Sequence, residues 1–87
     1  MPMIVEHALV SGSGKGPKGW FRVTKANVSV DHPFNFPEEH ALNIDFVSDE
    51  LGLDSRIAVE LSPDSARRLV NAINSALVRG EEEVGLR

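Results

Sequence analysis

The sequence contains no cysteine. Disulfide bonds and cysteine-ligated zinc sites are therefore excluded as sources of stability. This matters because an 87-residue chain has room for one domain and buries only about 60% of its unfolded surface. Small domains that lack enough core gain stability from disulfides, metals or oligomerisation. Self-association (a dimer or a higher oligomer) is the favoured supplement, ahead of a histidine-bound metal.

The sequence also lacks long apolar runs and a concentrated basic surface. No stretch approaches the roughly 20 apolar residues that a membrane helix needs, and residues 1–10 show no signal-peptide pattern. The formal net charge is −4, whereas phosphate binding needs clustered Lys and Arg. The basic residues are most concentrated in one segment, which contains Lys15, Lys18, Arg22 and Lys25. We therefore expect a cytoplasmic protein that binds neither membranes nor nucleic acid.

Apolar alternation predicts four β-strands. They span residues 3–10, 20–31, 40–47 and 56–61. Residues 11–19 contain four glycines and a proline, which predicts a flexible connection. Within 20–31 the apolar residues change parity partway, and one extra residue in a strand has that effect. We place this β-bulge near Thr24 and Lys25, the alternative being a strand covered on both faces.

Residues 62–80 carry the signals of a well-capped helix. Ser62 suits the N-cap, Pro63 the first helical position and Asp64 the positive end of the helix dipole. Gly80 is predicted to end the helix. Residues at helical spacing form one apolar stripe: Ala66, Leu69, Val70, Ile73, Ala76 and Leu77. We expect a single domain over residues 1–80 and a flexible acidic tail over residues 81–87.

These elements predict an α+β fold of order β-β-β-β-α, with a four-stranded antiparallel sheet packed on one C-terminal helix. The helix is expected to lay its stripe on one face of the sheet. That face is made of Leu42, Ile44, Phe46, Ile57, Val59 and Leu61.

The opposite face of the last two strands carries the polar residues Asp45, Glu60 and Arg56. Two carboxylates beside an arginine can perform acid–base chemistry. The same residue types are also usual on a solvent-facing sheet surface or a polar subunit interface. This ordinary reading is favoured, so the three residues are an alternative catalytic set only.

Three histidines are candidate metal ligands. His7, His32 and His40 lie on separate segments, each beside an acidic residue, and neutral imidazoles bind zinc and other divalent ions. None of them has the short spacing that commits a pair of residues to one metal. We therefore expect no cofactor, with zinc or another divalent metal as the alternative.

The remaining candidates are contacts to a ligand or partner. Lys15 lies in a glycine-rich segment, but the pattern lacks the first glycine, the hydroxyl residue and the following helix of a phosphate-binding loop. A weaker anion site formed by backbone N–H groups is the residual alternative. Trp20 and Phe34 lie in or beside predicted loops, where aromatic side chains are good anchors for a partner.

Several segments together resemble a family of small uncharacterised bacterial proteins, mainly from actinobacteria. They are residues 12–16 (GSGKG), 19–21 (GWF), 31–33 (DHP), 39–46 (EHALNIDF) and 57–67 (IAVELSPDSAR). The family is a domain of unknown function, so the resemblance implies a fold and a bacterial source but no activity.

No catalytic constellation stands out. We expect a non-enzymatic, homo-oligomeric module that binds a protein partner or a small ligand. The alternatives are a histidine-based metal-binding protein or a small enzyme that uses the polar sheet face.

Overall fold

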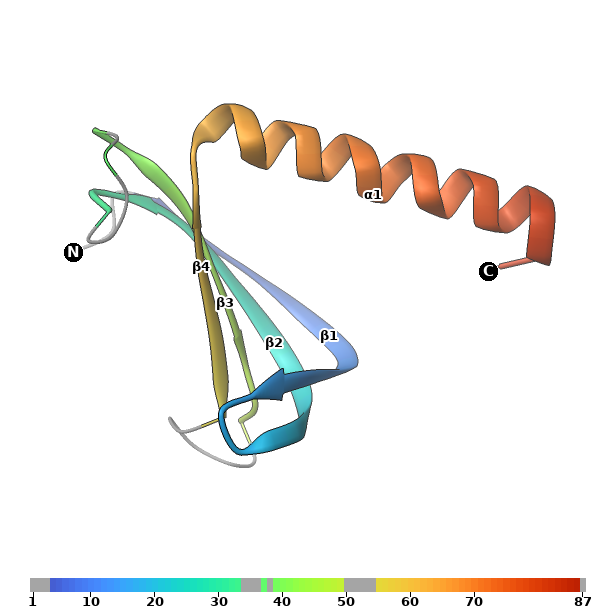
Figure 1. The fold of residues 1–87 in the computed structure, drawn as a ribbon, viewed down its shortest axis with the longest axis horizontal. Coiled ribbons are helices and arrows are strands. Elements are labelled where there is room, and N and C mark those ends of the chain that lie inside the picture. Colours follow the sequence, from blue (N-terminus) through green and yellow to red (C-terminus); the bar gives the residue numbers. More distant parts are fainter. Residues whose placement is uncertain (1–3, 34–36, 38, 50–54, 87) are drawn as a thin grey trace.

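The structure, a computed structural model, describes residues 4–33, 37, 39–49 and 55–86. Four strands are followed by one helix, and the strands form a single antiparallel sheet in the order β1-β2-β3-β4 (Figure 1). The elements are β1 (Ile4–Gly16), β2 (Gly19–Asp31), β3 (Ala41–Val47), β4 (Arg56–Leu61) and α1 (Pro63–Val84). The predicted α+β fold, a four-stranded antiparallel sheet followed by one C-terminal helix, is confirmed.

The register of the strands gives the sheet one apolar and one polar face. Ile44 of β3 lies between Val28 of β2 and Val59 of β4. The neighbouring residue in β3, Asn43, is paired with Ser29 and Glu60. Successive side chains of a strand point to opposite faces, so the apolar residues gather on one side of the sheet and the polar residues on the other.

The glycine-rich segment is strand rather than a flexible connection. β1 continues to Gly16, and β2 begins at Gly19, whose φ of 106° favours glycine. Gly14 is buried, and a Cβ there would lie 2.8 Å from Ile57 Cδ1 and 3.0 Å from Val23 Cγ2. The prediction of a flexible connection is wrong because residues 12–16 pair with residues 19–23 in the β1–β2 ladder, and Gly14 permits a close approach to Ile57.

The predicted β-bulge exists, but the extra residue lies in β1 rather than in β2. Leu9 pairs with Lys25 and Gly12 pairs with Val23, so two residues of β1 face Thr24 alone. Beyond this point the β1–β2 hairpin bends back, and β1 contacts β4, which is not its neighbour in the sheet (Figure 1). Bulges increase local bending and twist.

The helix begins as predicted but ends one turn later. The Ser62 hydroxyl accepts a hydrogen bond of 3.1 Å from the Ser65 N–H, and Pro63 occupies the first turn. The helix continues through Gly80 and is capped by Gly85, whose φ is 71°. The prediction that Gly80 ends the helix is therefore wrong, and the boundary between helix and tail moves to Gly85.

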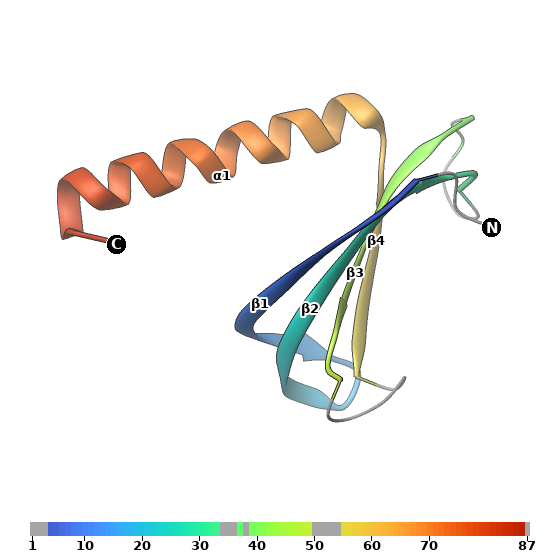
Figure 2. The same ribbon diagram turned by 180° about the vertical axis from the view of Figure 1, so that it is seen from behind.

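The helix covers much less of the sheet than predicted. It leaves the end of β4 at a steep angle and extends beyond the sheet, as opposite views show (Figures 1 and 2). Its 22 residues span about 33 Å, whereas a six-residue strand such as β4 spans about 20 Å. Among the described residues the buried side chains are few and small: Val23, Ala26, Ala41 and Ser48. The predicted helix–sheet layer therefore forms only near the start of α1.

Candidate functional site

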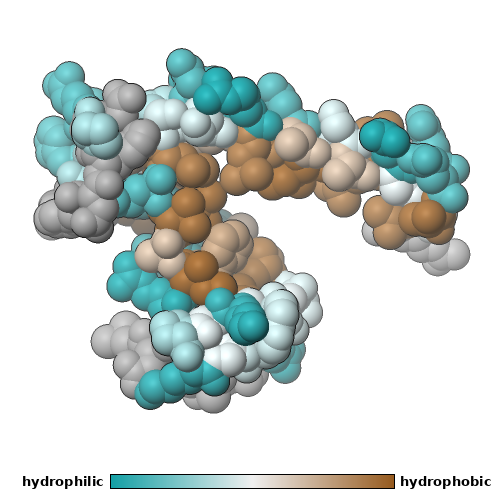
Figure 3. Space-filling model, viewed as in Figure 1, coloured by the Kyte–Doolittle hydropathy of each residue, from teal (hydrophilic) through white to brown (hydrophobic). Residues whose placement is uncertain are grey.

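An apolar groove lies between the first half of α1 and the apolar face of the sheet. Its volume is about 380 Å³. The residues that line it are Val28, Val30, Ala41, Leu42, Ile44, Pro63, Ala66, Arg67, Leu69, Val70 and Ile73. In Figure 3 the hydrophobic surface gathers on the inner sides of this angle, along the helix and on the facing part of the sheet. Arg67 is the one charged residue of the lining.

The apolar stripe of α1 extends beyond the groove, and the Leu86 side chain packs against it at Gly80. Ile73 and Leu77 are each 50% exposed and Val84 is 75% exposed. Gly80 also lies on this stripe by helical spacing. The second half of the helix has no part of its own sheet beneath it (Figures 1 and 2). These side chains form an extended apolar stripe rather than a set of scattered surface residues.

The exposed surface of the chain is too large for a compact monomer of its size. The accessible area is 6751 Å² for a mass of 9.5 kDa, and a compact monomer of that mass exposes about 5,000 Å². The radius of gyration is 14.5 Å, against about 12 Å for a compact 87-residue domain. The excess of about 1,700 Å² is open to burial by another chain.

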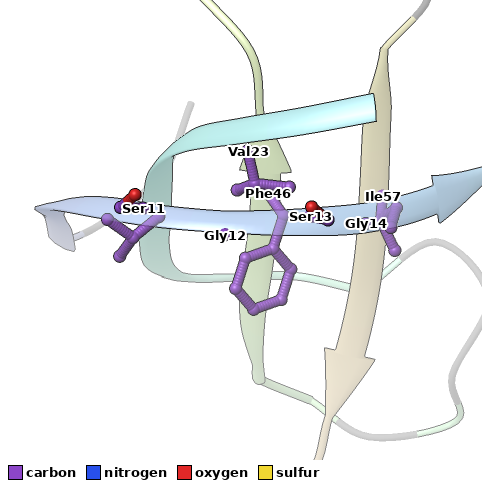
Figure 4. A pocket seen from close by; sticks show the side chains of 8 residues that line it. Ser11, Gly12, Ser13, Gly14, Val23, Phe46 and Ile57 are labelled. Atoms are coloured by element: carbon purple, nitrogen blue, oxygen red, sulfur yellow. The ribbon is translucent and has the colours of Figure 1, made fainter. Parts of the chain in front are cut away.

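A second hollow lies where β1 crosses the apolar face of the sheet. Its volume is about 370 Å³, and Phe46 and Ile57 reach toward the crossing strand (Figure 4). The lining residues are Val10, Ser11, Gly12, Ser13, Gly14, Val23, Phe46 and Ile57. This lining contains no charged side chain, so two serine hydroxyls are its polar side-chain groups.

The predicted polar set on the other face is partly assembled. Arg56 Nε donates a hydrogen bond of 2.8 Å to Asp45 Oδ1, and Arg56 Nη2 forms an ion pair of 2.8 Å with the same oxygen. Glu60 is paired with Asn43 across the β3–β4 ladder. The Arg56 side chain is 51% exposed, and exposed ion pairs of this kind contribute about 0–1 kcal/mol. These residues line neither of the two hollows described above.

The structure divides the three histidines between two places. His7 Nδ1 lies 2.6 Å from Asn27 Oδ1. The rings of His32 and His40 stack at 5.2 Å, and His32 Nδ1 lies 2.9 Å from the Glu39 carbonyl oxygen. Among the described residues no group of three His, Asp or Glu side chains is placed to hold a metal ion. Metal binding by these residues stays a prediction.

The predicted contact residues near the hairpin tip are accessible. Lys15 and Trp20 are partners in the β1–β2 ladder, and Trp20 is 72% exposed. Phe34 lies outside the described residues. Neither Lys15 nor Trp20 lines the two hollows.

The residues of the groove were visible in the sequence, but their role was not. The sequence identifies the stripe that contains Leu69 and Ile73, and it assigns the stripe to the chain's own sheet. The helix is about 33 Å long, which exceeds the lengths of β3 and β4 but not those of the 13-residue strands β1 and β2. The second half of the stripe stays uncovered because of the angle at which α1 leaves the sheet (Figures 1 and 2), and no sequence pattern sets that angle.

No described helix is long and apolar enough to cross a membrane. No curated protein and no solved structure shows significant similarity to the chain. The chain belongs to a family of unknown function, DUF6295, whose model matches residues 2–85.

Proposed function

We propose that the chain is a non-catalytic interaction module that assembles with copies of itself through the groove and the apolar stripe of α1. The exposed area of 6751 Å² carries this proposal. If each of two copies buried its excess of about 1,700 Å², the total of about 3,400 Å² would lie within the range of obligate homodimers. The small core supports the same proposal, because a chain that buries so few side chains gains little free energy from folding alone.

A matched pair of helix variants tests self-association. Leu77 belongs to the stripe and is 50% exposed, whereas Ser75 is exposed on the outer face of the helix by helical spacing. Leu77→Asp places a charge in the interface of both copies and removes two buried leucines. We expect the dimer to weaken at least about 100-fold, because each leucine contributes about 1.5 kcal/mol or more on burial.

Sedimentation equilibrium or light scattering over a dilution series measures the effect. Ser75→Asp introduces the same charge on the outer face of the helix and is expected to leave the assembly unchanged. A wild-type chain that is monomeric and stably folded at low micromolar concentration would overturn the proposal. Equal effects of the two substitutions would show that the stripe is not the interface.

A further inference from the structure

The polar flank of the apolar stripe repeats with a period that suits pairing of two α1 helices. Arg67 and Glu81 each lie seven residues from Asn74, on either side of it in the sequence. Residues seven apart lie on nearly the same side of a helix. Arg67 lines the groove, so this flank, rather than the outer face of the helix, borders the space that a partner would enter.

We propose that the α1 helices of two copies pair antiparallel about a two-fold axis near Asn74, each helix filling the groove of the other copy. This inference rests on the proposed self-association and specifies its geometry. Arg67 of each copy then lies beside Glu81 of the other, and the two Asn74 side chains meet at the axis. A two-fold interface uses the same patch on both copies, and here the patch is complementary to itself.

The position of the groove favours the antiparallel orientation. The groove is walled by the first half of α1 and by the sheet. An antiparallel partner brings its second half alongside this first half, so that its Leu77 and Val84 enter the groove between helix and sheet. Those residues are 50% and 75% exposed in the single chain. A parallel partner would leave both second halves away from either sheet.

The charges favour the same orientation. The last turn of α1 has no basic residue, although Glu81 to Glu83 lie near the negative end of the helix dipole. An antiparallel partner brings the positive start of its own helix, together with Arg67, to these carboxylates. In the single chain Arg67 forms an ion pair of 3.0 Å with Asp64, and both side chains are largely exposed. Such a pair is weak, so it does not prevent Arg67 from meeting a new partner.

Charge reversal distinguishes this geometry from other dimers. Arg67→Glu makes the flank acidic in both copies, and Glu81→Arg makes it basic in both copies. Each variant alone is expected to dimerise about 5- to 30-fold more weakly at low salt, because two attractive pairs become repulsive. A 1:1 mixture is expected to form heterodimers of wild-type affinity, since every pair is then complementary. The double variant is expected to match the wild type for the same reason.

Arg68→Glu is the control, because it makes the same charge change on the outer face of the helix. Dissociation constants come from sedimentation, and native mass spectrometry counts heterodimers in the mixture. Single variants that behave like Arg68→Glu, or a mixture without preferred heterodimers, would overturn the antiparallel pairing. If the wild type is a dimer in that case, self-association stands and only its geometry fails. A monomeric wild type would instead overturn the proposed function itself.

Cross-linking gives a second and independent measurement. The chain has no cysteine, so Asn74→Cys introduces a single thiol per copy at the axis. A short bis-maleimide is expected to join two copies at this position in high yield. Asn71→Cys, on the outer face by helical spacing, is expected to give little cross-linked dimer. Equal yields from the two variants would contradict the placement of the axis.

Discussion

At the scale of single residues, Gly14 determines how closely the hairpin approaches the sheet. It lies in the part of β1 that crosses Phe46 and Ile57 (Figure 4). The nearest side-chain atoms to its missing Cβ belong to Ile57 and Val23. Val23 is among the few buried residues of the chain, with 5% of its surface exposed. A side chain at position 14 would therefore disturb a large part of a small core.

Gly14→Ala is expected to lower the free energy of unfolding by about 1–3 kcal/mol, because the added methyl group overpacks this contact. Gly12→Ala is the control, since a Cβ at Gly12 would meet nothing within 4 Å. We expect that control to lie within about 0.5 kcal/mol of the wild type. Urea unfolding at one fixed protein concentration measures both. Equal stability of the two variants would show that β1 does not approach Ile57 as closely as the structure indicates.

At the scale of elements, the bounds that depend on local periodicity were predicted correctly from the sequence. The conformations that depend on contacts between distant residues were not. β4 has the predicted bounds because its alternation is regular and its flanks are polar. The glycine-rich end of β1 has no side-chain pattern, and its extended conformation accompanies its pairing with β2, with Gly14 also close to Ile57. Gly80 suited a helix end by composition, but Gly85 has the left-handed φ of 71° that ends the helix. Both errors arise from glycine, whose backbone suits several conformations.

The start of α1 depends on its cap more than is usual, because the helix has little packing against its own sheet. Ser62→Ala removes the acceptor of the 3.1 Å hydrogen bond from the Ser65 N–H. We expect a loss of about 1 kcal/mol in the free energy of unfolding. Ser75→Ala, at an exposed position within the helix, is expected to be neutral or slightly stabilising, because alanine is the better helix former. Circular dichroism during urea unfolding compares them, and equal stabilities would argue against the cap.

At the scale of the whole molecule, the sequence predicted the order of elements but not the angle between helix and sheet. The stripe that contains Ile73 and Leu77 and the sheet face that contains Ile44 are both apolar, so closure of one on the other was the natural expectation. The periodicity of apolar residues shows that one face of an element is to be buried. It does not show whether the residues that bury it belong to the same chain or to another. The steep angle of α1 (Figure 1) and the exposed area of 6751 Å² support the proposal that a second chain is the cover. The Asp45–Arg56 pair, by contrast, follows from strand pairing, which the alternation of β3 and β4 predicts.

If two chains share one core, folding and association occur together, and thermal stability depends on concentration by mass action. A tenfold increase in protein concentration contributes about 1.4 kcal/mol to the dimer. With an unfolding entropy of about 2.1 cal/mol/K per residue over two chains, the Tm is expected to rise by about 4 °C for each tenfold increase. Calorimetry over a hundredfold range of concentration measures this slope. Leu77→Asp is expected to lower the Tm and to reduce the slope, whereas Ser75→Asp is expected to keep the slope of the wild type. A wild-type Tm that does not depend on protein concentration over that range would show that each chain folds alone.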